Sequence, residues 1–287
     1  MKHLVPILIT GLLAVSCIIN VGGGAAIVGS YTEDGIDYSE VREVGPFRGL
    51  VSSLPANVYY EQADAQEVRV ESTEELADKV ITVVEDGILK LRLEEGRYPK
   101  LILRVVVSSP DIESLHAAGS GKIIHKGILH TDGNLNLKVS GSGDFRVGSV
   151  DCRDLAIQCS GSGSIRIDGV TAEGFEGKAS GSGGLRIDAV SCDGFNVTVS
   201  GSGGISIDRL TAKGNAAART SGSGRIRLRE VAVEGDMDLK TSGSGGIDVH
   251  GRCHGVTATT TGSGSISGHL DYTGINAHSS GSGRVRL

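Results

Sequence analysis

Arginine and aspartate recur at a regular spacing in the second half of the chain. Arg146, Arg166 and Arg186 follow one another every 20 residues, and Asp168 and Asp188 lie two residues after the second and third arginine. A guanidinium group binds carboxylate, sulfate or phosphate through paired hydrogen bonds. If the spacing places these side chains on one surface, they form a candidate binding site, the arginine platform. Its residues are Arg146, Arg166, Asp168, Arg186, Asp188, Arg227 and Arg229.

The expected ligand of the arginine platform is an anionic glycan, a lipid headgroup or a partner protein. The other interpretation, which the sequence favours, is a solvated surface on which the charges pair with one another, each exposed pair contributing about 0 to 1 kcal/mol. The chain has 28 Lys and Arg against 34 Asp and Glu, so nucleic acid is not an expected partner. It has no Trp, and Tyr272 is the only Tyr after residue 118. Sugars usually stack on aromatic rings, so this composition disfavours a platform for neutral sugars.

The sequence shows no catalytic pattern. A polysaccharide-cleaving enzyme on a β-helix needs several carboxylates converging in a cleft, whereas the Asp residues here occur about once per repeat. The Ser residues recur at fixed repeat positions and the 8 His follow no motif, so no Ser-His-Asp arrangement is recognisable. Neither zinc-type cysteine spacing nor Asp-rich calcium turns occur, and no cofactor or metal is expected. We expect a non-enzymatic protein; the alternatives are a polysaccharide-acting enzyme and an ice-binding surface of stacked hydroxyls.

A Gly-Ser-Gly tripeptide repeats through the region that contains the platform. Successive copies are 19 to 22 residues apart, and a near-fixed period of this length is the signature of a solenoid. Because it recurs, we interpret the tripeptide as a structural corner rather than a phosphate-binding loop, which would occur once, before a helix. The nine copies begin at Gly119, Gly141, Gly161, Gly181, Gly201, Gly222, Gly243, Gly262 and Gly281.

Apolar residues alternate with polar ones on both sides of each corner. Ile165 and Ile167, for example, flank Arg166, a period of two that predicts a strand with one buried face. Apolar residues also lie six and four positions before each corner, such as Leu155 and Ile157. These patterns predict an all-β fold with a parallel β-solenoid of about nine coils of 19–22 residues, spanning 119–287. A further inward column is expected nine positions after each corner: Ile128, Val150, Val170, Val190, Leu210 and Val231.

The solenoid accounts for the unusual composition. The chain has 44 Gly and only 3% aromatic residues, yet it lacks the Gly-X-Y period of collagen. Cys152 and Cys192 share a column two coils apart, about 9.6 Å at the spacing of strands and too far for a disulfide. Cys159 lies in another inward column. We expect free, buried thiols with a packing role.

The N-terminus resembles an export signal of the lipoprotein type. Lys2 precedes an apolar run at 4–15, followed by Ser16-Cys17. We expect residues 1–17 to be this signal, with Cys17 lipidated and anchoring the chain to a membrane. Plain secretion and an uncleaved anchor are the alternatives, because Ile18-Ile19-Asn20-Val21 prolongs the apolar run. Residues 18–43 are expected to be a linker.

Residues 44–118 are expected to form a smaller β domain that caps the first coil. Residues 72–78 suit one helical turn, and Asp86-Gly87 is a hairpin signal. No linker separates this domain from the first Gly-Ser-Gly, so we expect the two parts to share a core. The expected strands lie at 47–52, 57–61, 67–71, 80–85, 88–93 and 101–107.

These segments resemble the head GIN domain family in their order and sequence. The similar segments are VGPF (44–47), NVYY (57–60), VRVE (68–71), GILKLRL (87–93), VVVSSP (105–110) and LHAAGSG (115–121), with the recurrent SGSG. The family consists of exported proteins common in Bacteroidetes and described as auto-transporter adhesins. The resemblance covers about residues 40–287. It implies an all-β fold with a β-helix-like array, an envelope location and no established activity, and it provides no catalytic residues.

The sequence therefore predicts a cell-envelope adhesin or binding scaffold. We expect an exported chain, an outer-membrane lipoprotein held by Cys17, that binds an envelope protein or an anionic glycan. The final coil has an unpaired edge at Val285 and Leu287. We expect a second subunit to cover that edge in a homo-oligomer, or Arg284 and Arg286 to protect it.

Overall fold

The computed structural model describes residues 18–19 and 26–287. The expected export signal at 1–17, with Cys17, lies outside the described residues. The described chain is nearly all β, and its one helix is the short α1 (Glu74–Ala77) within the predicted helical turn. None of the residues described here forms a helix with the length and apolar character needed to cross a membrane.

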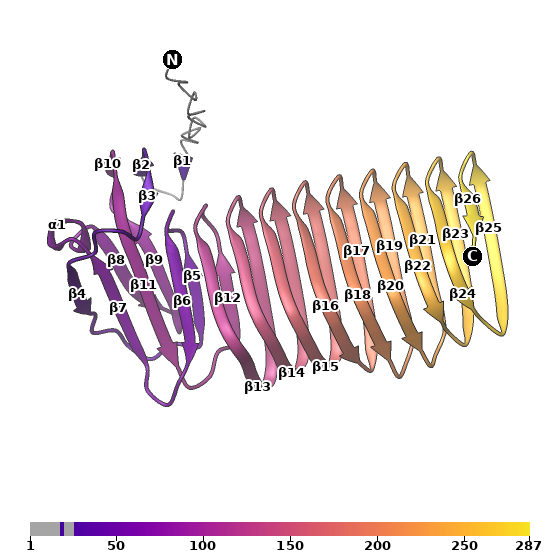
Figure 1. The fold of residues 1–287 in the computed structure, drawn as a ribbon, viewed down its shortest axis with the longest axis horizontal. Helices are drawn as coiled ribbons and strands as arrows, with labels where there is room; N and C mark the ends of the chain where they lie inside the picture. The colour runs from indigo at the N-terminus through magenta and orange to yellow at the C-terminus, as the bar shows by residue number, and fades with distance from the viewer. Residues whose placement is uncertain (1–17, 20–25) are drawn as a thin grey trace, which may run out of the picture.

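The first twelve strands form the N-terminal β region, at the indigo end of Figure 1. They include the predicted hairpin, whose turn residues Asp86 and Gly87 have φ of 53° and 73°. The strands are β1 (Ile18–Ile19), β2 (Ala26–Val28), β3 (Tyr31–Thr32), β4 (Tyr38–Val41), β5 (Gly49–Ser52), β6 (Asn57–Gln62), β7 (Glu67–Ser72), β8 (Val80–Glu85), β9 (Ile88–Leu93), β10 (Gly96–Tyr98), β11 (Leu101–Ser109) and β12 (Ser114–Ala117).

The remaining strands form the predicted parallel β-solenoid of about nine turns. Each pairs with the strand one coil later, as in Phe145↔Ile165↔Leu185. The strands are β13 (Lys122–Gly141), β14 (Asp144–Gly161), β15 (Ser164–Gly181), β16 (Gly184–Cys192), β17 (Gly194–Gly201), β18 (Gly204–Ala212), β19 (Ala216–Gly222), β20 (Arg225–Val233), β21 (Met237–Gly243), β22 (Gly246–Arg252), β23 (Gly255–Gly262), β24 (Ser265–Asp271), β25 (Gly274–Gly281) and β26 (Arg284–Arg286).

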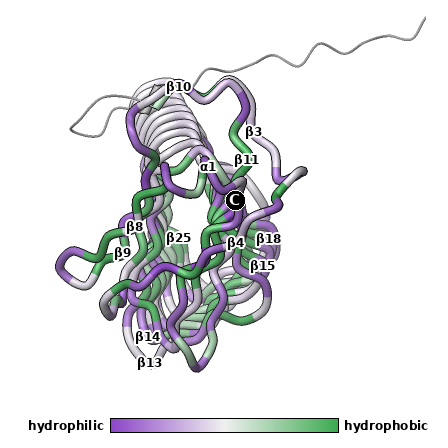
Figure 2. The backbone as a smooth tube through the Cα atoms, turned by 90° about the vertical axis from the view of Figure 1, so that its left-hand side faces the viewer, coloured by the Kyte–Doolittle hydropathy of each residue, from purple (hydrophilic) through white to green (hydrophobic). Residues whose placement is uncertain are grey.

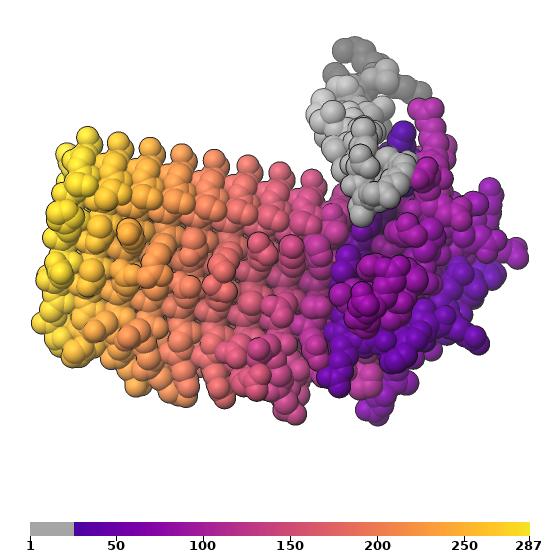
Figure 3. Space-filling view, turned by 180° about the vertical axis from the view of Figure 1, so that it is seen from behind, coloured from indigo at the N-terminus to yellow at the C-terminus, as the bar shows by residue number. Residues whose placement is uncertain are grey.

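Each coil has three sides around a narrow apolar core. In β14 the buried residues fall into three groups, within 144–147 (first side), 150–152 (second side) and 155–160 (third side). The view along the solenoid shows the corners superposed as a pale stack at one apex (Figure 2). Seen from behind, the coils form parallel ridges (Figure 3). Equivalent outward side chains of successive coils are therefore neighbours, about 4.8 Å apart.

The corners confirm that Gly-Ser-Gly is a structural element. Gly161 has a φ of 93°, which favours glycine. The backbone N–H groups of Ser162 and Gly163 both donate to the Gly141 carbonyl, at 2.9 and 3.0 Å. A Cβ on Gly163 would lie 2.0 Å from the carbonyl oxygen of Gly143. Successive corners approach too closely for a side chain there.

The N-terminal β region continues the sheets of the solenoid. On the third side β13 pairs with β12, β12 with β5, and β5 with β9. On the first side β13 pairs with β6, and β6 with β11. Buried Leu50, Val58 and Leu89 belong to the same hydrophobic cluster as Ile123 of the first coil. The two parts share one continuous core.

The segment for which the sequence predicts a linker, 18–43, contains four short strands in its described residues, the first of which, β1, pairs with β2. β2 pairs with β10, β3 with β11 and β4 with β7. Glu33 fixes β3 in place by accepting hydrogen bonds from Asn57 Nδ2 at 2.6 Å and from the Tyr59 hydroxyl at 3.1 Å. These strands are two to four residues long, too short to show a sequence period.

The inward position predicted for Ile128 is wrong. Ile128 is 65% exposed, and Leu129 is buried in its place. The first coil has a register shift between His125 and Ile128, next to Gly127 with a φ of 92°. The extra residues of this 22-residue coil move the inward position by one. Ile275 lies six positions before the last corner, in the same column as buried Leu155, but it is 44% exposed because no further coil of the structure covers it.

Candidate functional site

The arginine platform residues lie together along the first side of the solenoid. Arg146, Arg166 and Arg186 occupy equivalent positions of β14, β15 and β16, and Arg227 occupies the same column in β20, after Ser206. All four arginines are exposed because the buried residues on either side of them face the core. Asp168, Asp188 and Arg229 lie at the next outward position, at the bend toward the second side.

Part of the platform is neutralised by ion pairs. Arg186 Nη2 lies 3.3 Å from an Asp208 oxygen, and Arg186 Nε lies 3.9 Å from Asp188 Oδ1. Arg229 Nη1 lies 3.0 Å from the other Asp208 oxygen. Asp208 thus pairs with the coils before and after its own, although it was not among the predicted platform residues. Its place in the column of Asp168 and Asp188 was the available signal.

Three arginines of the platform have no such partner. Among the described residues, no carboxylate lies within 4.0 Å of the Arg146, Arg166 or Arg227 side chains. Beside the arginine column lie small residues, Ser164 and Gly184, which leave the guanidinium groups uncovered. Like charges in register repel one another. The described part of the structure therefore holds a row of exposed arginines in which three lack a carboxylate partner.

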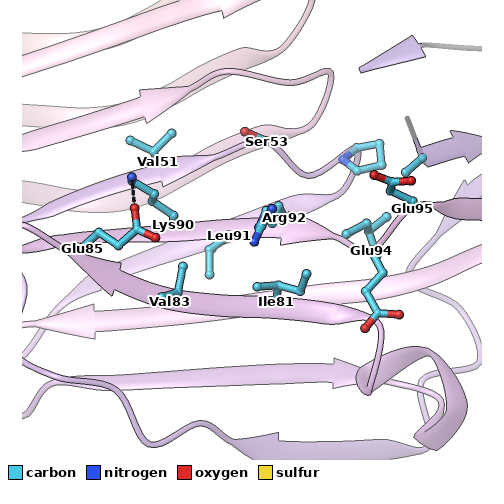
Figure 4. A pocket seen from close by; sticks show the side chains of 13 residues that line it. Val51, Ser53, Ile81, Val83, Glu85, Lys90, Leu91, Arg92, Glu94 and Glu95 are labelled. Atoms are coloured by element: carbon cyan, nitrogen blue, oxygen red, sulfur yellow. Dashed lines mark hydrogen bonds and ion pairs between the residues drawn. The ribbon is translucent and has the colours of Figure 1, made fainter. Parts of the chain in front are cut away.

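A second candidate site is a cavity of about 590 Å³ on the N-terminal β region (Figure 4). Its apolar floor includes Val51, Ile81 and Val83, from β5 and β8. At its rim Lys90 is ion-paired with Glu85, and Arg92 points across the floor. None of the predicted site residues lines this cavity. The sequence feature that could have indicated it is the pair of apolar residues Ile81 and Val83 on the outward face of β8.

The described residues provide little for catalysis. His116 Nε2 lies 2.7 Å from Ser140 Oγ, but burial, with a smaller effect of Lys138, lowers the pKa of His116. No carboxylate in the described part hydrogen-bonds to this imidazole, so the pair lacks the third member of a triad. No group of three His, Cys, Asp or Glu within residues 26–287 is arranged to hold a metal ion.

The four cysteines of the solenoid are free and buried, as predicted. Burial, with a smaller effect of Asp151, raises the pKa of Cys152 to about 11. Burial likewise raises the pKa of Cys192 to about 12. A nucleophilic cysteine requires a lowered pKa, so these thiols are packing residues.

Solved structures with the same fold come from two species of Parabacteroides. A "putative lipid binding protein" from Parabacteroides distasonis is 20% identical, with a TM-score of 0.69 over 91% of this chain and 98% of that chain. A "putative adhesin" from the same species is 19% identical, with a TM-score of 0.63 over 90% and 99%. A "putative adhesin" from Parabacteroides merdae is 17% identical, with a TM-score of 0.62 over 91% and 98%.

The sequence comparisons agree with the resemblance noted above. No curated protein matches the chain significantly. The family model described as "Putative auto-transporter adhesin, head GIN domain" matches residues 46–230. That range includes most of the N-terminal β region and the coils that contain the arginine platform. The chain therefore belongs to the head GIN domain family.

Proposed function

We propose that this protein is a non-catalytic binding scaffold of the cell envelope, whose arginine platform binds an anionic glycan. The observation that carries the proposal is the in-register row of Arg146 and Arg166, without carboxylate partners in the described chain. A polymer with repeated carboxylates or sulfates contacts several coils at once, and linked contacts strengthen binding. The family description as an adhesin supports the same role.

The binding test uses heparin and polygalacturonate as anionic probes. We expect R146Q/R166Q/R227Q to bind at least tenfold more weakly, a loss of about 1.4 kcal/mol or more. The control K213Q/K240Q/R252Q removes the same charge from the other sides and should bind as the unsubstituted protein does. Equal losses in both variants would mean that only net charge matters, and would refute the platform.

The location proposed for the scaffold is the outer membrane, with Cys17 lipidated. The order of Lys2, the apolar run at 4–15 and Ser16-Cys17 supports this anchor. Metabolic labelling with an alkyne fatty acid should label the full chain and should not label Cys17→Ser. Equal labelling of both would place any lipid elsewhere.

Lipid binding is a second candidate function, supported by the apolar cavity of Figure 4. A neighbouring structure is described as a lipid binding protein. The cavity's volume and apolar floor suit an acyl chain. A fluorescent fatty acid should bind the protein and lose affinity on I81Q/V83Q. The control is V41Q, at an exposed valine of β4. Unchanged affinity in I81Q/V83Q would exclude this cavity as the lipid site.

A further inference from the structure

The third side of the solenoid has a hollow where one outward column loses its side chains. The hollow has a volume of about 440 Å³, and we call it the glycine hollow. Two glycines form the gap, with polar side chains before and after them in the column. In successive coils the column contains Asn134, Asp154, Gly174, Gly194, Asn215 and Asp236, and it ends with Gly255 and Gly274, which lie beyond the cavity.

The fold does not require glycine in this gap. Neither Gly174 nor Gly194 has a positive φ. A Cβ added to Gly194 would meet no atom within 4 Å, and at Gly174 it would meet the movable carboxylate of Asp154. Glycine inside a strand destabilises it by about 0.5–1 kcal/mol relative to alanine. A glycine in a strand often marks a bulge, a bend or a place where a ligand or another backbone approaches closely, and here the cavity beside the two glycines favours a ligand.

Amide groups border the glycine hollow and are oriented by arginines. Arg219 Nη1 donates to Asn196 Oδ1 at 3.2 Å, and Arg153 donates to Asn134 Oδ1 at 3.0 Å. These bonds fix the orientation of both amides. Their NH₂ groups donate to no acceptor among the described residues. The side chain of Asn136 makes no hydrogen bond in the same part of the chain. These groups remain available to a ligand.

The charges around the glycine hollow compensate one another. Glu176 lies 2.8 Å from Lys178, and Asp154 lies 3.6 Å from Arg153. Asp238, in the next cavity along the solenoid, pairs with Arg219. At the glycine hollow itself, the lining therefore offers many hydrogen-bonding groups with little net charge, which suits an uncharged, hydroxyl-rich ligand.

The glycine hollow is part of a longer groove. A cavity of about 760 Å³ at the junction with the N-terminal β region shares Asn134 and Asn136 with it. A cavity of about 380 Å³ on the other side shares Phe195. The groove thus crosses successive coils about 4.8 Å apart. This spacing is close to the advance per sugar in an extended polysaccharide.

We propose that this groove binds a neutral oligosaccharide lying along the solenoid axis, with one or two sugar rings seated on Gly174 and Gly194. Stacking on aromatic rings does not contribute, because Phe175 and Phe195 are only 3% exposed beneath the floor. Hydrogen bonds to Asn136, Asn196 and their neighbours hold the hydroxyl groups instead. This site is independent of the arginine platform, which takes an anion on another side of the molecule.

The test uses a panel of neutral hexasaccharides of glucose, mannose, xylose and N-acetylglucosamine, with affinity measured by calorimetry. We expect at least one member to bind and Gly194→Gln to weaken it at least tenfold. The matched control is Gly274→Gln, in the same column beyond the groove, where a Cβ also meets nothing within 4 Å. Thermal melts should show both variants folded.

Affinity for the neutral sugar should not change in R146Q/R166Q/R227Q or at high salt. That result separates the two proposals. The anionic-glycan proposal is tested by R146Q/R166Q/R227Q with anionic probes, and this one by Gly194→Gln with neutral hexasaccharides. The proposal is overturned if no hexasaccharide of the panel binds, or if Gly194→Gln binds as well as Gly274→Gln. Binding of extended peptides alone would also overturn it, by assigning the groove to protein partners.

Discussion

Gly163 lies between two strands and Gly194 is the first residue of β17, and a side chain would meet different surroundings at each. At Gly163 an added Cβ would clash with the Gly143 carbonyl at 2.0 Å, and at Gly194 it would meet open space. The first glycine allows two coils to approach, whereas the second leaves room on the surface. Both residues are glycine, but the structural reason for having glycine differs between the two positions.

This difference predicts opposite effects of alanine. Gly163→Ala should lower the free energy of unfolding by about 2–4 kcal/mol, because backbone must move to accept the methyl group. Gly194→Ala should raise it by about 0.4–1 kcal/mol, because it restricts the unfolded chain without strain. Urea unfolding followed by circular dichroism measures both. Equal effects of the two substitutions would contradict the assignment of roles.

The buried thiols predict how stability depends on pH. Burial raises the pKa of Cys152 to about 11 and that of Cys192 to about 12, above the value of about 8.5 for an exposed thiol. The unfolded chain therefore loses these protons first. Their contribution to stability is complete below about pH 8.5 and is lost as the pH rises toward the folded values.

Cys192→Ala should therefore reduce the fall in unfolding free energy between pH 8.5 and about 11. Native Cys192 should also react with a thiol reagent at pH 8 far more slowly than the urea-unfolded chain. The measurements are urea unfolding across this pH range and absorbance-detected labelling. Equally fast labelling of native and unfolded protein would show that the thiol is not protected.

At the scale of elements, the strand ladder on the first side combines repulsion and pairing. Arg166 is in register with Arg146 and Arg186, whereas Asp208 lies between Arg186 and Arg229. Exposed pairs of this kind contribute little individually. Nevertheless, the contacts between arginines destabilise the fold, whereas the ion pairs of Asp208 stabilise it.

Arg166→Gln should therefore leave the melting temperature unchanged or raise it slightly, by a few tenths of a kcal/mol in stability. Asp208→Asn should lower stability by about 0.5–1 kcal/mol, because two arginines lose their partner. Both effects should decrease in 1 M salt, since the arginines are exposed and Asp208 is only half-buried. A larger loss for Arg166→Gln than for Asp208→Asn would contradict this account of the ladder.

The regular elements were predictable from sequence because their cause is periodic. The alternation around Arg166 and the recurring corners determine which residues face the core of every similar coil. The position of Ile128 was not predictable in this way, because the extra residues of the first coil shift the register. Strands β2 to β4 depend on distant partners such as β10 and β7, which a short segment does not reveal.

The candidate sites were predictable only in part, for a related reason. The arginine column repeats with the coil, so its alignment follows from the period. The glycine hollow arises where glycines replace the polar residues of the column that contains Asn134 and Asp154. It can be recognised as a candidate site only from the three-dimensional structure, which shows the cavity beside it. The apolar cavity combines β5 with the β8–β9 hairpin, and their pairing is not contained in either segment.

At the scale of the whole molecule, each coil contacts mainly the coils before and after it. Removal of one complete coil should therefore preserve the fold. Deletion of residues 206–226 joins Ile205 to Arg227, which occupies the position of Ser206 in the next coil. We expect a folded, monodisperse protein with an unchanged circular dichroism signal per residue.

Deletion of residues 206–215 removes about half a coil and is the matched control. It places outward residues in inward positions, so this variant should unfold or aggregate. Circular dichroism and light scattering compare the two deletions. If both fold equally well, or if the complete-coil deletion unfolds, the in-register stacking described here is wrong.

The central claim is that the first side of the solenoid binds an anionic polymer, and arginine footprinting tests it most directly. The protein is modified with phenylglyoxal in the presence and absence of polygalacturonate, and modification of each arginine is measured by mass spectrometry. The account predicts protection concentrated at Arg146, Arg166 and Arg227, with Arg252 and Arg97 unprotected. Uniform protection, or protection confined to other arginines, would contradict it.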